Sequence, residues 1–270
     1  MADVMAERVR SIQRCVGICF IAGAVLITLS ILLQPSLGDP NRADLVLEKI
    51  SKQDWGGWMT LHAVMMLGFS LVAVGFTALG FLLHLRGASG AASVVTACAL
   101  LGASLWVAFF AAELYGYRFL TNLYSADPSL ATMLFSTVWH WKLGAMAAAS
   151  VLTFVAVIAA GVTGTARGLM PVWLGWGGTL FAIAGTAVYF FGFLGSTATG
   201  APINPMQSLA VRIGIGLPLQ VWLAATGFVL ARARIRIEPA APAAHAPRPK
   251  PAAPAPPAEP PGPGGPPPTA

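Results

Sequence analysis

Residues 61–83 read LHAVMMLGFSLVAVGFTALGFLL, an apolar run in which His62 is the one ionisable side chain. A helix needs about 20 apolar residues to cross a hydrocarbon core about 30 Å thick. The run is long enough, and it ends at His84-Leu85-Arg86-Gly87, where a basic residue and a turn signal follow each other. This stretch therefore predicts a transmembrane helix.

Five other runs share this apolar character, at residues 15–33, 91–112, 143–162, 172–194 and 213–231. The whole chain is 56% hydrophobic and 10% charged, with a mean hydropathy of +0.72, whereas a soluble domain carries roughly 25% charged residues. The sequence thus predicts an all-α protein: a bundle of six transmembrane helices over residues 15–237, preceded by a cytoplasmic N-terminus at residues 1–14.

The first run resembles a signal peptide because Arg8, Arg10 and Arg14 precede it. It is longer, however, than the apolar core of about 7 to 15 residues that signal peptides have, and residues 34–38 offer no small-x-small cleavage site. We therefore expect an uncleaved membrane anchor.

The distribution of Lys and Arg predicts which side of the membrane each end occupies. The predicted inner side has eight such residues near the span ends: Arg8, Arg10, Arg14, Arg86, Arg167, Arg232, Arg234 and Arg236. The predicted outer side has six: Arg42, Lys49, Lys52, Arg118, Lys142 and Arg212. The positive-inside rule then predicts a multi-pass protein of the plasma membrane with cytoplasmic N- and C-termini.

The C-terminal residues 238–270 consist mostly of Pro, Ala and Gly. Such a composition offers no large apolar groups for a core, and it predicts a disordered cytoplasmic tail.

The basic residues of the chain lie at the ends of apolar runs rather than in one patch, which argues against a nucleic-acid partner. Membrane lipids are the expected partners, and other membrane subunits are a second class.

Four local signals predict shorter features. Residues 34–58 alternate charged and apolar side chains, which indicates a short amphipathic helix on the outer surface. Asp127-Pro128 is typical of a helix start, so a helix should begin before the fourth run enters the membrane. Pro218 should bend the sixth span. Small residues such as Gly177 and Gly178 should let helix backbones approach closely.

Ionisable residues near the membrane are the best functional clues, because burying one in lipid is costly. Five of them fall at the outer ends of the predicted spans and form the candidate ligand-binding site: His62, Glu113, His140, Lys142 and Arg212. None is expected near the midplane, which argues against a proton pump. The first hypothesis is that Arg212 and Lys142 bind an anionic solute or lipid head group, with Glu113 setting selectivity. Cations that merely extend to the interface are the simpler explanation.

A second hypothesis is a b-type haem held by His62 and His140, since imidazole is a suitable axial ligand for iron and both spans run in the same direction. Two histidines in an interfacial aromatic belt would explain the same pattern. A third hypothesis is a non-catalytic membrane subunit or scaffold. The sequence shows no nucleophile triad, zinc motif, phosphate loop or dinucleotide fingerprint, which favours a protein without catalytic or metal-binding residues.

Overall fold

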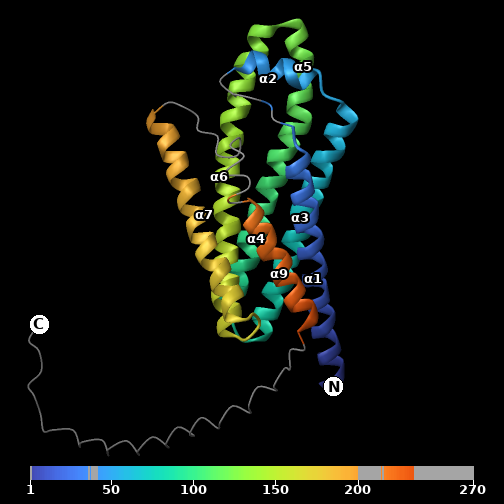
Figure 1. Cartoon of the computed structure of the whole chain (residues 1–270), viewed down its shortest axis with the longest axis vertical. Helices are drawn as coiled ribbons and strands as arrows, with labels where there is room; N and C mark the ends of the chain where they lie inside the picture. Colours follow the sequence, from blue (N-terminus) through green and yellow to red (C-terminus); the bar gives the residue numbers. More distant parts are fainter. Residues whose placement is uncertain (1, 36, 38–41, 200–213, 215, 234–270) are drawn as a thin grey trace, which may run out of the picture. The chain divides into compact units, whose positions relative to one another are not determined.

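The computed structural model describes residues 2–35, 37, 42–199, 214 and 216–233, and it is helical without strands in this part of the chain. The prediction of an all-α protein is confirmed. The elements shown in Figure 1 are, in chain order, α1 (Ala2–Leu33), α2 (Ala43–Ser51), α3 (Trp55–Leu85), α4 (Ser89–Ala111), the π-helical turn η1 (Ala112–Gly116), α5 (Tyr117–Ala126), α6 (Pro128–Ala166), α7 (Val172–Thr199) and α9 (Leu217–Arg232). The predicted tail at 238–270 lies outside the described residues.

Five helical segments are long and apolar enough to cross a membrane: Glu7–Leu33, Trp55–Leu85, Ser89–Ala126, Pro128–Ala166 and Val172–Phe191. The sixth predicted span corresponds to α9, which is apolar but has 16 residues, fewer than the about 20 that a span needs. Part of that predicted span lies outside the described residues. The chain is a multi-pass membrane protein with five or six spans. Pro218 stands in the first turn of α9, shortly after Gly214 and Gly216, whose backbone is π-helical. The bend expected at this proline stays a prediction, because most of the preceding segment lies outside the described residues.

The membrane helices pack against one another through points of very close backbone approach. Helix α1 contacts α3 and α9, α4 lies between α3 and α6, and α7 packs on α6. A Cβ atom on Gly17 would lie 2.6 Å from the Ala231 Cβ and 2.8 Å from the Gly227 carbonyl oxygen, so α1 and α9 meet where both helices have small residues. Association by small residues is the expected mode in lipid, because the hydrophobic effect no longer drives helices together there.

A second apolar cluster sits at one end of the bundle, around α2, α5 and the first turns of α6. Its buried members are Ala43, Val46, Leu47, Ile50, Trp58, Leu114, Tyr117, Leu120, Ala131, Phe135 and Trp139. The predicted amphipathic helix is confirmed as α2, which turns its apolar side to this cluster. The predicted start of α6 is confirmed too, because the Asp127 side chain accepts a hydrogen bond from the backbone N–H of Leu130 (3.0 Å). We call this cluster and its three helices the cap.

The turns with the predicted inner arginines gather at the other end of the bundle. Arg167, after α6, donates a hydrogen bond to the Gly87 carbonyl oxygen in the α3–α4 turn (3.3 Å). The last turn of α9 lies beside the first half of α1, where a Cβ on Gly17 would touch Ala231. Figure 1 shows the start of α1, both of these turns and the end of α9 at the end opposite α2 and α5. The cap and the basic turns therefore mark opposite ends of the helices.

Candidate functional site

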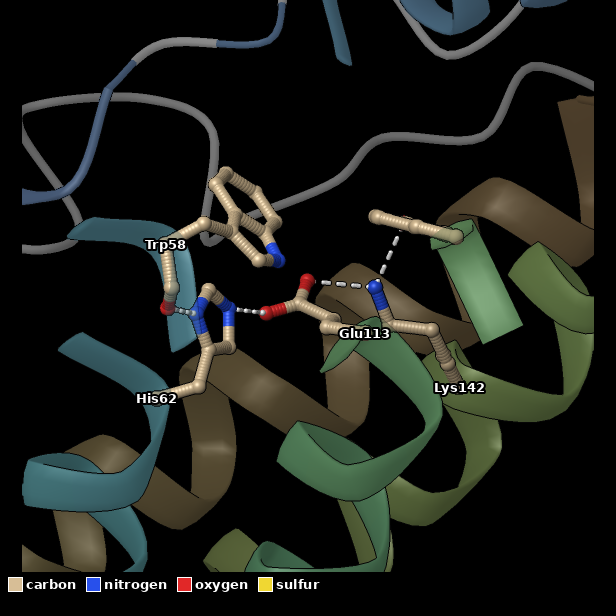
Figure 2. Close-up of polar contacts among 5 residues, drawn as sticks. Trp58, His62, Glu113 and Lys142 are labelled. Carbon is tan, nitrogen blue, oxygen red and sulfur yellow. Dashed lines mark hydrogen bonds and ion pairs between the residues drawn. The ribbon is translucent and has the colours of Figure 1, made fainter. Parts of the chain in front are cut away.

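Three of the five predicted site residues lie together below the cap, each from a different element: His62 of α3, Glu113 of η1 and Lys142 of α6. Figure 2 shows the Glu113 carboxylate between the other two side chains. Its Oε2 lies 3.0 Å from His62 Nε2, and its Oε1 accepts a hydrogen bond from Lys142 Nζ at 2.5 Å. Their exposed fractions are 0%, 5% and 1% respectively, so all three polar groups are buried.

Glu113 reaches this position from an irregular turn of its helix. Residues Ser89–Ala126 form one continuous helical stretch that is interrupted by the π turn η1. The turn buries the neighbouring residues Glu113 and Leu114 and leaves Tyr115 68% exposed. Single π turns inside α-helices are rare and frequently occur at functional sites, so this one marks the carboxylate as a feature of interest.

Aromatic rings surround the Lys142 ammonium group. Its Nζ lies 4.6 Å from the centroid of the Phe109 ring, 4.5 Å from that of Tyr117 and 5.0 Å from that of Trp139. Nζ also donates a hydrogen bond to the Tyr117 hydroxyl oxygen (2.6 Å). The faces of aromatic rings attract cations, and more strongly where water is excluded. The box of Phe109, Tyr117 and Trp139, which we call the aromatic box, therefore replaces part of the water that Lys142 lost on burial.

The contacts of His62 limit where the protons of the cluster can lie. His62 Nδ1 lies 2.8 Å from the Trp58 carbonyl oxygen, which can only accept, so a hydrogen bond there needs a proton on Nδ1. A hydrogen bond between His62 Nε2 and the Glu113 oxygen needs a second proton, because two lone pairs facing each other would repel. If both hydrogen bonds form and Lys142 is an ammonium group, His62, Glu113 and Lys142 hold one more positive than negative charge, whichever of the first two binds that proton.

A large cavity opens beside this cluster and has Glu113 and Lys142 in its wall. Its volume is about 100 Å³, within about 1140 Å³ of non-atom space that includes its open mouth. Six segments bound it: α1 with the residues that follow it, α3, the continuous stretch of α4 and η1, α6, α7 and α9. Most of its wall is apolar. Trp139 and Gln220 also line it and are 7% and 5% exposed, and neither Trp139 Nε1 nor Gln220 Oε1 has a hydrogen-bond partner among the described residues.

The structure does not bring His140 into the cluster. It precedes Lys142 by two positions on α6, and two helical positions differ in direction by about 200°. His140 is exposed, and its Nδ1 lies 2.7 Å from the Ser136 carbonyl oxygen. Arg212, the fifth predicted residue, lies outside the described residues.

The haem hypothesis remains a prediction, but this geometry does not favour it. Both ring nitrogens of His62 already contact protein oxygen atoms, so an iron ligated there would displace Glu113 or Trp58. Elsewhere, the residues that the structure covers hold no group of three or more His, Cys, Asp or Glu side chains that could bind a metal ion.

Sequence reasoning missed Tyr117, Trp139 and Gln220. For the first two, helix spacing held the signal. Tyr117 follows Glu113 by four positions and Trp139 precedes Lys142 by three, so each lies on the same helix face as a charged residue. Gln220 had no comparable neighbour, since its importance comes from a cavity that six distant segments build.

Comparisons of this chain with protein-family models, with curated proteins and with solved structures find no match in any of the three. The interpretation of the site therefore rests on its own geometry.

Proposed function

We propose that this chain is a plasma-membrane protein with cytoplasmic termini that binds the anionic group of a solute or lipid at Lys142, near the outer face. The observation that carries the proposal is the buried Lys142 side chain in a cavity wall, where it shares its carboxylate partner Glu113 with His62. A buried charge without a counter-charge is strongly unfavourable. An anion at the cavity end of the cluster would supply the missing negative charge.

The proposed orientation of the bundle in the membrane rests on the arginines at the end opposite the cap. Cytoplasmic loops carry an excess of Lys and Arg, and the turns at that end contain Arg86 and Arg167. The cap then faces outward and the ligand reaches the cavity from the outer leaflet or from the outer solution.

The other polar groups near Lys142 suit an anion with one charge. Trp139 Nε1 is a donor without a partner in the described part of the chain and could bond to a ligand oxygen. Glu113 already neutralises one positive charge, so a ligand with two negative charges would face repulsion from its carboxylate. The site therefore favours a singly charged group such as a carboxylate or a phosphodiester.

Binding of anionic and zwitterionic probes by the delipidated full-length protein tests this proposal. Native mass spectrometry would count bound phosphatidylglycerol, phosphatidylcholine with the same chains, and inorganic phosphate. Wild type should bind an anionic probe at least tenfold better than phosphatidylcholine, and Lys142→Met should lose that preference. Lys142→Arg, which keeps the charge, should retain part of it.

Lys52 supplies a matched control, because it forms a similar ion pair with Glu48 at 2.6 Å but is exposed on α2. Lys52→Met should bind like wild type. If Lys142→Met kept the full preference for anionic probes, the proposal would be wrong. A non-catalytic subunit that holds other membrane proteins would then be the better explanation, and co-purifying membrane subunits would support it.

A further inference from the structure

The cavity beside Lys142 is far longer than a small anion needs. Its wall on α6 runs from Trp139 to Phe154, fifteen positions that correspond to roughly 22 Å along the helix axis. The α6 residues between them recur every three or four positions, so a single face of the helix forms this wall. The cavity is therefore elongated along the direction in which lipid chains lie.

The charged groups of the wall lie at one end of this length. Glu113 and Lys142 lie together there, whereas the wall farther along has no charged side chain among its described residues and is mostly apolar. Its polar members are Ser150, Thr153, Tyr189 and Gln220. Apolar walls give water few hydrogen-bond partners, and an empty space costs its lining atoms their van der Waals contacts. The best occupant thus has one charged end and one hydrocarbon part.

A second, smaller pocket adjoins the cavity near Gln220. Its volume is about 20 Å³, and it shares the wall residues Ile27, Phe69, Thr153, Leu219 and Gln220 with the cavity. Its remaining wall is apolar and belongs to α3, α4 and α9: Val72, Phe76, Ala99, Ala103 and Leu223. The two spaces together continue the apolar path away from Lys142.

We infer that the ligand is an anionic lipid, with its head group at Lys142 and Trp139 and a hydrocarbon chain along α6 towards Thr153 and Leu219. This inference rests on the proposed function and names its ligand class. Gln220 Oε1 can accept a hydrogen bond from a lipid hydroxyl or amide in the middle of the path, since it lacks a partner among the described residues. A water-soluble anion would use the head-group end alone.

Filling the chain path without touching the charged cluster tests this inference. Gly216 lines the cavity, and among the described residues a Cβ there meets only Ile31, at 3.9 Å, so Gly216→Trp places an indole in the path. Leu219→Trp is a second variant at the same wall. Leu217→Trp is the matched control, because Leu217 lies between them, is 41% exposed and does not line the cavity.

The readout is the affinity for phosphatidylglycerol and its displacement by glycerophosphoglycerol, the same phosphodiester head group without hydrocarbon chains, measured on the folded full-length protein. Both path variants should weaken phosphatidylglycerol binding at least tenfold, the control should not, and glycerophosphoglycerol should fail to displace the lipid. Glycerophosphoglycerol that binds wild type as tightly as the lipid does, and loses binding in Lys142→Met, would overturn the lipid inference while the anion site stood. Unchanged lipid binding in both path variants, with melting temperatures like the control's, would also overturn it. If Lys142→Met bound both the lipid and the chain-free head group as wild type does, the anion site itself would be refuted.

Discussion

Gly178 of α7 lies directly against the indole ring of Trp222 on α9, closer than any side chain at that position would allow. The Trp222 Nε1–H donates a hydrogen bond to the Leu174 carbonyl oxygen on α7 at 2.9 Å. A missing side chain on one helix and a hydrogen bond from the other therefore hold α7 and α9 together on one side of the cavity.

Gly178→Ala should destabilise the protein by about 1–3 kcal/mol, because the added methyl group collides with Trp222 and separates the two helices. Gly177→Ala is the control. A Cβ on Gly177 meets no atom of the described residues within 4 Å, and Ala is the better helix former by about 0.5–1 kcal/mol. Thermal unfolding in detergent, followed by circular dichroism, should show a lower midpoint for the first variant alone. Equal midpoints would contradict the close contact.

Glu113→Gln should cost about 3–5 kcal/mol, because it leaves the buried Lys142 without its counter-charge. Adding Lys142→Met should recover part of the loss, since the unpaired charge is then gone as well. The exposed pair Lys52–Glu48 gives the comparison, and Glu48→Gln should change stability by less than about 1 kcal/mol. A double variant less stable than Glu113→Gln alone would mean that Lys142 does not depend on the carboxylate.

Asp127→Ala should destabilise the first turn of α6 by about 0.5–2 kcal/mol, because the Leu130 N–H loses its acceptor. Asp127→Asn keeps an acceptor at this position and should behave like wild type. Amide hydrogen exchange in residues 128–132 is the local measurement. Identical exchange in the two variants would show that the cap bond contributes nothing.

A membrane-impermeant thiol reagent added to intact cells should label Lys49→Cys on α2 and not Gly90→Cys in the α3–α4 region, in a background without the three native cysteines. Both positions are exposed, so the difference would report the side of the membrane alone. Labelling of both from outside, or of Gly90→Cys alone, would reject the proposed orientation.

The sequence predicted those parts of the fold that depend on neighbours along the chain. Asp127 next to Pro128 predicted the start of α6, and the alternation of charged and apolar residues around Val46 and Ile50 predicted α2. Both signals depend only on residues that are close in the sequence. The sequence also predicted that His62, Glu113 and Lys142 lie at the same level along the helices, because all three stand at span ends. It did not predict that they touch, because contact depends on how each helix is rotated about its axis.

The same limit explains why His140 was grouped with Lys142. The two residues share a depth on α6 but point in different directions, and only the packing of α6 on α4 decides which one turns inward. The sequence did not predict the π turn at Glu113 either, because a turn of this kind depends on the surrounding helices rather than on residues 112–116 alone. The cavity was beyond reach for the same reason, as six segments from Ile27 to Gln220 build its wall.

The turn η1 also sets a condition on how this protein can change length during evolution. A π turn holds one residue more than an α turn, because its hydrogen bonds reach from residue i to i+5. Deleting one residue between Ala112 and Gly116 would leave an unbroken regular helix, yet a different side chain would then face His62. Descendants with that deletion should still insert and fold, but they should lack the carboxylate between histidine and lysine, and an alignment gap at this point would identify them.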